Sequence, residues 1–301
     1  MKSVSTGFTL WRNMLRVHQW LKNLLLFIPL FAAHDLMNSV SWLVLGVAFV
    51  AFSLCASTVY ILNDILDVES DRQHPRKRHR PFASGAVPVW LGLAIAPCLL
   101  VLAIALAFLV GVNFLLWMLL YFAITTAYSL YLKRLMIIDC LTLAMLYTLR
   151  IIAGASAAGT HLTFWLLAFS VFLFLSLAFI KRYAELDVQI QHGQKKAHGR
   201  GYFTSDAPLV QSMGITSGYV SVLVLALYFN SEAVLMLYKS PEIVWGAVPV
   251  MLFWVSWMWM RAHRGQMNDD PLVFAVKDPA SLCAGLIFGS LLLLGTVGVP
   301  W

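Results

Sequence analysis

Four polar side chains with the spacing of a binding site follow directly on an apolar run at residues 59–62. They are Asn63, Asp64, Asp67 and Asp71. On a continuing helix, Asn63, Asp67 and Asp71 lie one turn apart on the same face, and like charges at such spacing need a counter-charge. Because all its ligands are oxygens, the cluster suits Mg²⁺, which bridges carboxylates to substrate phosphates. A solvated helix end with ordinary acids is the alternative.

A basic loop comes next in the chain. Arg72, Lys77 and Arg80 belong to a run of cations that contains Pro75 and is closed by Pro81, and the prolines favour a shaped loop over a longer helix. On its own, a basic run at a membrane is typical of the cytoplasmic side or of contact with anionic lipids. Next to carboxylates suited to Mg²⁺ it favours a phosphate site, because a pyrophosphate leaving group needs both kinds of residue.

The surrounding chain is much more apolar than a soluble protein. Of its 301 residues, 60% are hydrophobic and 12% are charged, and the mean hydropathy is +0.79. Soluble domains have about 45–50% apolar and about 25% charged residues. The 4 cysteines occur singly in apolar stretches, which is typical of small buried side chains rather than of metal or disulfide sites. The composition therefore predicts an integral membrane protein.

The apolar stretches predict an all-α, polytopic membrane protein of about nine transmembrane helices, in a single domain over residues 1–301. A span needs about 20 apolar residues, and no alternating strand pattern competes. Residues 1–22 mix aromatic and basic side chains and are expected to form an interfacial helix on the cytoplasmic side. The prediction of the first span is the weakest, because this span is short and contains Pro29. The expected spans are residues 23–34, 40–62, 89–110, 113–132, 137–158, 163–180, 211–230, 242–260 and 281–300.

Lysine and arginine fall almost entirely on one side of these spans. With the N-terminus in the cytoplasm, all of the 21 cations except Arg150 and Lys239 lie at the cytoplasmic face, as the positive-inside rule requires. The C-terminus is then outside, and the long charged loops face the cytoplasm, where we expect the active site. The net charge of +7 reflects this asymmetry, and no binding of nucleic acid is predicted.

Two groups of polar residues lie within the spans. Tyr121, Thr125 and Tyr128 form one stripe on the fourth helix, and Asp139 and Arg150 are nearly in line on the fifth. A cation in the middle of a span costs at least about 2.5–3.5 kcal/mol, so Arg150 should face protein or water. It either lines the active site or bonds to carbonyl groups in a structural role, and the sequence leaves both interpretations open.

The motif Asn-Asp-x-x-Asp-x-x-x-Asp at the cytoplasmic end of the second helix resembles the first aspartate motif of the UbiA superfamily of membrane prenyltransferases. The resemblance extends over about residues 16–290. Finer features are similar to one branch, the decaprenyl-phosphate phosphoribosyltransferases (5-phosphoribosyl-monophosphodecaprenol synthases). These features are Gln19-Trp20-Leu21-Lys22-Asn23, the block Asp71–Pro81, Tyr128-Ser129 with Leu132-Lys133-Arg134 and Asp139, Tyr147-x-x-Arg150 with Ala153-Gly154-Ala155, and Lys181-Arg182-Tyr183-Ala184-Glu185-Leu186.

One departure from the wider superfamily supports this branch. Ordinary members carry a second aspartate-rich motif on the sixth helix, where this chain has Lys181, Arg182 and Glu185. Replacing carboxylates with cations suggests a substrate with more phosphate and fewer bridging metal ions, which fits phosphoribosyl pyrophosphate. An interfacial charge pair that closes a span is the alternative interpretation.

The resemblance implies Mg²⁺-dependent transfer of 5-phosphoribose from phosphoribosyl pyrophosphate to a polyprenyl (decaprenyl-type) phosphate, with release of pyrophosphate, in the cytoplasmic membrane of a bacterium. Asp64, Asp67 and Asp71, assisted by Asn63, are then the catalytic residues and hold the metal. The residues expected to bind substrate are Lys22, Asn23, Arg72, Lys77, Arg80, Tyr128, Lys133, Arg150, Lys181, Arg182, Tyr183 and Glu185.

Two other functions stay open at this point. A prenyltransferase of the usual UbiA type attaches a polyprenyl chain to an aromatic or quinone-precursor acceptor, and it needs the second aspartate motif. A membrane transporter would use Arg150 in its pathway, but it predicts internal repeats and charge in mid-span, whereas the sequence shows no repeat and places nearly all of its charge at one face. No role is assigned to Asp269, Asp270 or Asp278, and no oligomeric state is predicted.

Overall fold

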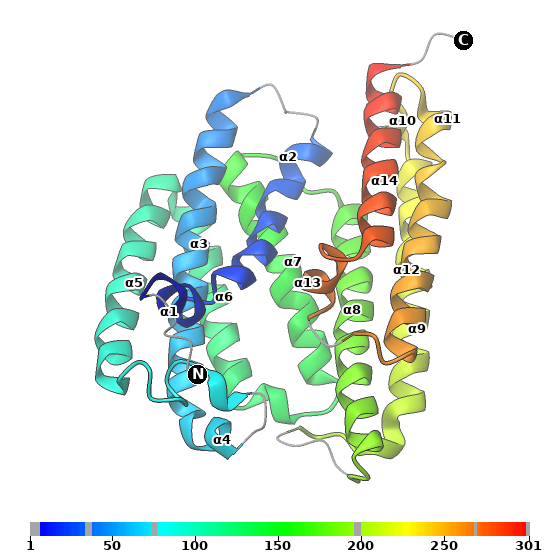
Figure 1. Ribbon diagram of the computed structural model, residues 1–301. Helices are drawn as coiled ribbons and strands as arrows, with labels where there is room; N and C mark the ends of the chain where they lie inside the picture. Colours follow the sequence, from blue (N-terminus) through cyan, green and yellow to red (C-terminus); the bar gives the residue numbers. More distant parts are fainter. Residues whose placement is uncertain (1–6, 34–37, 74–76, 196–199, 268–269, 299–301) are drawn as a thin grey trace. The chain divides into compact units, whose positions relative to one another are not determined.

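The computed structural model describes residues 7–33, 38–73, 77–195, 200–267 and 270–298, and these residues form helices and no strands (Figure 1). Within them, 8 helical segments are long and apolar enough to cross a membrane. The expected all-α, polytopic membrane protein is therefore confirmed, whereas the sides on which the termini lie stay a prediction. The segments are Ser39–Leu66, Val89–Val110, Val112–Leu130, Ile138–Ala158, Phe164–Gln191, Thr204–Phe229, Pro241–His263 and Pro279–Val297.

The segment expected as the first span is built differently. Val17–Phe27 forms a 3₁₀ helix, η1, and Ile28–Ala32 continues it as a short α-helix, α2. Pro29 lies at the start of α2, where its missing N–H costs least. A 3₁₀ helix rises about 2.0 Å per residue, against about 1.5 Å for an α-helix. The η1 helix is therefore longer than an α-helix with the same number of residues.

The chain divides into two compact units. Unit 1 comprises residues 1–130 and 149–161, and unit 2 comprises residues 131–148 and 162–301. Helix α7 (Ile138–Ala158) therefore contributes its first half to unit 2 and its second half to unit 1. The expectation of one domain over residues 1–301 stays a prediction.

In unit 1, helix α3 (Ser39–Leu66) packs along α5 (Val89–Val110) and contacts α6 (Val112–Leu130) and η1 (Figure 1). The hydroxyl of Thr58 on α3 donates a hydrogen bond to the carbonyl of Ala96 on α5, at 3.3 Å. The second half of α7 meets η1 at Gly154, where an added Cβ atom would collide with the backbone of Leu26. Glycine therefore permits the close approach of the two elements. The shorter elements are α1 (Gly7–Met14), α4 (Val68–Gln73) and η2 (Lys77–His79).

In unit 2, the long helix α8 (Phe164–Gln191) packs along α9 (Ala207–Phe229), and α12 (Ala247–His263) contacts both of them and α14 (Pro279–Val297). Ser176 on α8 donates to the carbonyl of Gly214 (2.8 Å) and accepts from the indole N–H of Trp259 (3.0 Å). Three helices thus meet at one buried hydroxyl. The shorter elements are η3 (Leu132–Arg134), η4 (Thr204–Asp206), α10 (Glu232–Leu235), α11 (Pro241–Val244) and α13 (Pro271–Ala275).

Large apolar side chains stay exposed along several of the long helices. Only 17% of the apolar stretch of α5 is buried, and the share for α14 is the same. Leu109 on α5 is 77% exposed and Val297 on α14 is 70% exposed. Extended apolar surfaces of this kind mark contacts with another apolar phase, so these helix faces are suited to lipid.

Candidate functional site

Two buried carboxylates and two arginines form the centre of the polar cluster in unit 1. Asp64, near the end of α3, forms ion pairs with Arg16 and with Arg80, whose Nη1 lies 3.1 Å from Asp64 Oδ1. The same Arg80 nitrogen lies 2.6 Å from Oδ2 of Asp71 on α4. Both carboxylates are buried, whereas Arg80 is partly exposed. Arg16 and Arg80 therefore supply the positive charge that the closely spaced acids require.

The one-turn spacing of the acidic motif continues across the end of α3. The N–H of Asp67 donates to the carbonyl of Asn63 (2.9 Å), and the N–H of Asp71 donates to the carbonyl of Asp67 (2.8 Å). Asp67 is the C-cap residue of α3 and is half-buried. The side chain of Asn63 donates to Ser129 Oγ on α6 (2.8 Å). Tyr128 is half-buried beside this serine, and its role in substrate binding stays a prediction.

The carboxylates suit a Mg²⁺ ion that is also bound by phosphate. Oxygens of Asp64 and Asp71 converge on a single nitrogen of Arg80, so both carboxylates point to one location. Among the described residues, no three Asp, Glu, His or Cys side chains gather as a complete metal site. Mg²⁺ commonly uses one or two carboxylates, with substrate phosphates and water completing its shell. The donor chemistry therefore fits, and the assignment of the metal ligands stays a prediction.

Arg16 is a member of this cluster that was not predicted from the sequence. It adopts a left-handed backbone conformation (φ 50°) between α1 and η1. Its Nε donates to Asp64 Oδ2 (3.3 Å), and its guanidinium lies 5.3 Å from the centroid of the Tyr60 ring. Because 48 positions separate Arg16 from Asp64, no local spacing indicates the pair. The only indication in the sequence was that the clustered acids need a positively charged partner.

The arginines of the basic loop make two kinds of contact: one with the acidic cluster and one within the loop. Arg80 contacts the acids, whereas the exposed Arg72 donates from Nε to the carbonyl of Ala83 (3.3 Å) and fastens the end of the loop. Lys77 begins η2. Binding of phosphate by Arg72 and Lys77 stays a prediction.

Arg150 on α7 is buried and hydrogen-bonded to η1. Its Nε donates to Oδ1 of Asn23 (2.9 Å), and its Nη2 donates to the hydroxyl of Tyr121 (2.8 Å). Asn23 in turn donates to Ser53 Oγ on α3 (2.9 Å). These contacts support the structural interpretation, because they fix η1, which carries the half-buried Lys22, to three helices of unit 1. Direct contact of Arg150, Asn23 or Lys22 with substrate stays a prediction.

A second charged cluster lies in unit 2 around Arg182, whose side chain is fully buried. Arg182 Nη2 lies 2.6 Å from Asp139 Oδ2, and Nη1 pairs with Glu185 along α8. The hydroxyl of Tyr202 donates to Asp139 Oδ1 (2.7 Å) and accepts from the N–H of Ile137 (2.6 Å). Burial raises the pKa of Tyr202, so the phenol stays protonated and keeps its bond to Asp139.

The backbone beside this cluster is strained. Ile137 has φ 67°, a left-handed conformation that is rare for a β-branched residue and costs about 1–3 kcal/mol. Arg200 donates to the carbonyl of Lys133 (3.3 Å), and its Nε lies 3.9 Å from Glu185. Residues 200–202 are thereby fastened to residues 133–139. The pairs around Arg182 support a positioning role for this arginine, and binding of substrate by Lys133, Arg182 and Glu185 stays a prediction.

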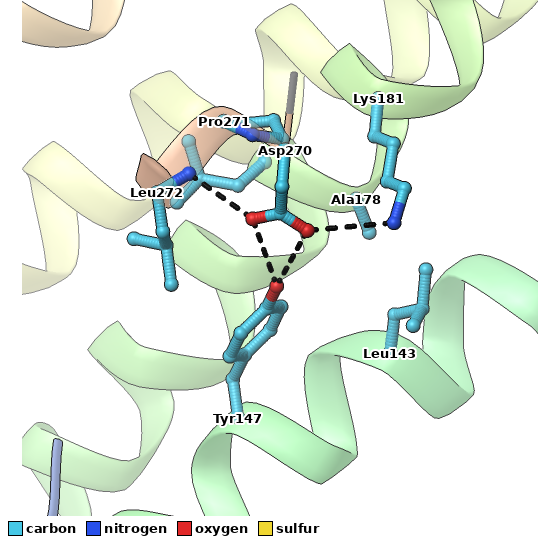
Figure 2. Close-up of a pocket in the computed structure, with 8 residues that line it drawn as sticks. Leu143, Tyr147, Ala178, Lys181, Asp270, Pro271 and Leu272 are labelled. Atoms are coloured by element: carbon cyan, nitrogen blue, oxygen red, sulfur yellow. Dashed lines mark hydrogen bonds and ion pairs between the residues drawn. The ribbon is translucent and has the colours of Figure 1, made fainter. Parts of the chain in front are cut away.

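A small pocket in unit 2 is formed by α7, α8 and α13 (Figure 2). Figure 2 shows Tyr147, Lys181 and Asp270 meeting there. The Tyr147 hydroxyl lies 3.3 Å from each Asp270 carboxylate oxygen. Lys181 Nζ lies 3.4 Å from Asp270 Oδ2. Lys181, an expected phosphate ligand, therefore contacts a carboxylate to which the sequence assigned no role. Asp269 lies outside the described residues.

Tyr183 and Asp278 make contacts that hold helices together. The Tyr183 hydroxyl lies 3.1 Å from Nδ1 of His263 on α12, and its ring packs against Trp259. Asp278 is the N-cap of α14, where it accepts from the N–H of Ser281 (2.9 Å), and it also accepts from the indole N–H of Trp257 on α12 (2.9 Å). The expected role of Tyr183 in substrate binding stays a prediction.

The sequence matches the UbiA prenyltransferase family over residues 24–282. Nodulation protein NoeC of Azorhizobium caulinodans is 38% identical over 296 residues, covering 93% of this chain and 91% of that protein. Decaprenyl-phosphate phosphoribosyltransferase of Mycolicibacterium smegmatis is 32% identical over 274 residues, covering 87% and 85%. An uncharacterised protein of Sinorhizobium fredii is 36% identical over 281 residues, covering 93% of this chain and 54% of that protein. The chain thus spans about half the length of this last relative.

Solved structures share the fold. A UbiA homologue from Archaeoglobus fulgidus, solved with DMAPP and Mg²⁺, matches with a TM-score of 0.70 at 17% identity and covers 95% of this chain and 98% of that one. At this identity the likeness concerns the fold alone. The UbiA-like helical bundle expected from the sequence is therefore confirmed, as is the resemblance to the phosphoribosyltransferase branch.

Proposed function

The chain belongs to the UbiA prenyltransferase family, and from this premise we propose that it transfers 5-phosphoribose from phosphoribosyl pyrophosphate to a polyprenyl phosphate and releases pyrophosphate. The relative named decaprenyl-phosphate phosphoribosyltransferase supports this choice. The observation that carries it is the pairing in the second cluster, where Asp139 and Glu185 both contact the buried Arg182. These two acids are therefore engaged by a cation instead of forming a second set of metal ligands, and the partly exposed Lys181 on the same helix is the cation that would suit an additional phosphate of the donor.

In unit 1, the acidic cluster would receive the pyrophosphate of the donor. Asp64, Asp67 and Asp71 would hold Mg²⁺, which, when bound, neutralises charge on the leaving pyrophosphate. Arg80 is partly exposed, so its guanidinium can bind phosphate oxygens by a two-pronged contact while it stays beside the acids.

The reaction breaks the bond between ribose C1 and a pyrophosphate oxygen and forms a bond from C1 to an oxygen of the lipid phosphate. Because the acceptor is already an anion, no strong general base is required, and catalysis rests on positioning and on stabilising the leaving group. Lys22, on the η1 segment that Arg150 holds, is our candidate for the contact with the lipid phosphate. We place the site at the cytoplasmic face of a bacterial cytoplasmic membrane.

The test uses the full chain in detergent or nanodiscs with Mg²⁺, a polyprenyl phosphate and phosphoribosyl pyrophosphate labelled in the ribose. Labelled lipid that forms only when both substrates and Mg²⁺ are present is the expected result. A parallel reaction offers a prenyl pyrophosphate and an aromatic acid, the substrates of a prenyltransferase of the usual kind. Product in this second reaction and none in the first would refute the proposal.

A further inference from the structure

Asp270 is the common acceptor of three donors in the pocket of unit 2. The hydroxyl of Tyr147 comes from α7, the ammonium group of Lys181 from α8, and the N–H of Leu272 from the start of α13 (Figure 2). Tyr147 and Lys181 thus approach one carboxylate from two different helices. A hydroxyl and an ammonium group that converge on one anion are the donors of an anion site.

The contacts with Asp270 are longer than a carboxylate of optimal fit would make. Lys181 Nζ lies at 3.4 Å and the Tyr147 hydroxyl at 3.3 Å, whereas ammonium–carboxylate bonds are typically about 2.7–2.9 Å long. The pocket has a free volume of about 10 Å³, which is room for about one water molecule. A phosphate group therefore fits between Lys181 and Tyr147 only after Asp270 has left.

The element that carries Asp270 is short. Helix α13 has 5 residues, Pro271–Ala275, and a helix of this length is not stable by itself. Its contacts with unit 2 include those of Asp270, the buried side chains of Pro271 and Val273, and the ring of Phe274, whose centroid lies 5.8 Å from the guanidinium of Arg261. Exchange of the Asp270 contacts for contacts with a free anion would remove polar contacts that tie the start of α13 to α7 and α8.

We propose that Lys181 and Tyr147 form an anion site for a phosphate group of the substrate, and that Asp270 occupies this site until the phosphate displaces it together with α13. The identity of the substrate rests on the proposed function. The anion site itself is testable without any transfer reaction. Because the phosphate can belong to the soluble donor or to the lipid acceptor, the test has one arm for each source.

The first experiment measures binding of inorganic pyrophosphate with Mg²⁺, and of a short-chain polyprenyl phosphate in micelles, to the full chain. Asp270→Asn keeps a side chain that caps a helix but removes the competing charge. If Asp270 occupies the site nine-tenths of the time, affinity for the ligand that uses the site rises about tenfold. Asp278→Asn is the matched control, because Asp278 also caps a helix that begins with proline, and it should leave both affinities unchanged.

The ligand whose affinity rises in Asp270→Asn identifies the source of the phosphate. A gain for pyrophosphate assigns the site to the donor, and a gain for the lipid assigns it to the acceptor. Adding Lys181→Gln to Asp270→Asn should abolish the gain. Unchanged or weaker binding of both ligands to Asp270→Asn would overturn the proposal, because Asp270 would then only position Lys181 and Tyr147. Failure of the transfer reaction with intact anion binding would instead count against the proposed function alone.

A second experiment follows α13 directly. Leu272→Cys is placed in a chain whose Cys55, Cys98, Cys140 and Cys283 are replaced by alanine, and the rate of labelling by a soluble thiol reagent is measured. Leu272 lines the pocket and is half-buried, so displacement of α13 exposes it. Saturating ligand should raise the labelling rate at least about threefold, whereas an unchanged rate with bound ligand would contradict the displacement.

Discussion

Asp64, Asp67 and Asp71 share one motif, but their surroundings separate a contribution to stability from a contribution to activity. Asp64 and Asp71 are each 2% exposed and contact Arg80, whereas Asp67 is half-buried at the end of α3. Removing one partner of a buried ion pair leaves an uncompensated charge. A substitution at Asp67 leaves the pairs with Arg80 in place.

Asp67→Ala is therefore expected to lower phosphoribosyl transfer by roughly a hundredfold or more, because it removes a ligand of the leaving-group site. The melting temperature in detergent should fall less than for a substitution at the buried Asp64, because Asp67 is only half-buried. Glu69→Gln is the matched control, since Glu69 is an exposed acid of α4, and it should retain full activity. Wild-type turnover in Asp67→Ala would refute the metal-site assignment.

Asp64→Ala should instead lower stability. Breaking a buried ion pair costs about 3–5 kcal/mol, and because Arg16 and Arg80 are partly exposed we expect about 1–3 kcal/mol. Thermal unfolding in detergent measures the loss. The double variant Asp64→Ala with Arg16→Ala should lose less than the sum of the single variants, and simple additivity would show that Arg16 and Asp64 do not interact.

Asp278 predicts a dependence of stability on pH. Burial alone would raise its pKa, but hydrogen bonds from Ser281 and Trp257 and the charge of Arg261 outweigh burial, and the pKa is lowered. A lowered pKa stabilises the fold above the unfolded-state value of about 3.9, and the effect is lost as the pH falls through the folded-state pKa. The melting-temperature difference between wild type and Asp278→Asn should therefore shrink below about pH 4. A constant difference down to pH 3 would contradict the lowered pKa.

The residue types and spacing were enough to predict that the acids of the motif lie close together, because the pattern repeats within one helical stretch. The contact partners of that motif and of Lys181 could not be predicted from local spacing, because they come from distant parts of the chain. Arg16 lies 48 positions from Asp64, and Asp270 lies 89 positions from Lys181. Tyr202 reaches Asp139 over 63 positions. Contacts of this kind depend on how helices pack, which a single sequence does not display.

Among the elements, η1 departs most from its prediction. The sequence predicted an interfacial helix up to residue 22 and a short, weakly supported span over residues 23–34, but Val17–Phe27 is a single 3₁₀ helix of 11 residues, and runs longer than about four residues are uncommon. Two contacts fix the segment from α7, namely the bond from Arg150 to Asn23 and the close approach of Leu26 to Gly154. Neither contact has a counterpart in local hydropathy, so the conformation of this segment was not predictable from the sequence, and its crossing of the membrane stays a prediction.

Gly154→Ala should displace η1 from α7, because the added Cβ atom collides with the backbone of Leu26. Overpacking of this kind costs about 1–3 kcal/mol, and activity should fall as well, since η1 carries Lys22. Gly46→Ala is the matched control: an added Cβ there meets nothing within 4 Å, so the helix should keep or gain stability. Equal melting temperatures and activities of the two variants would contradict the close packing of η1.

For the whole molecule, the number of membrane crossings decides whether the two termini lie on the same side. Among the described residues, the 8 long helices alone would place them on the same side, whereas the distribution of lysine and arginine predicts opposite sides. A ninth crossing by the 11 residues of η1 and the 5 residues of α2 would reconcile the two. At about 2.0 and 1.5 Å per residue, the two elements could extend at most about 30 Å if they were collinear, which is comparable with the thickness of the hydrocarbon core.

We therefore expect nine crossings, with the N-terminus in the cytoplasm and the C-terminus outside. Epitope tags before Met1 and after Trp301 test this in separate strains, with antibody binding measured in intact and in permeabilised spheroplasts. The C-terminal tag should bind antibody in intact cells, and the N-terminal tag only after permeabilisation. A tag inserted after Gly193, in a loop expected to be cytoplasmic, is the control for intact membranes. Both terminal tags on one side would show that η1 and α2 do not cross, because the other crossings are even in number.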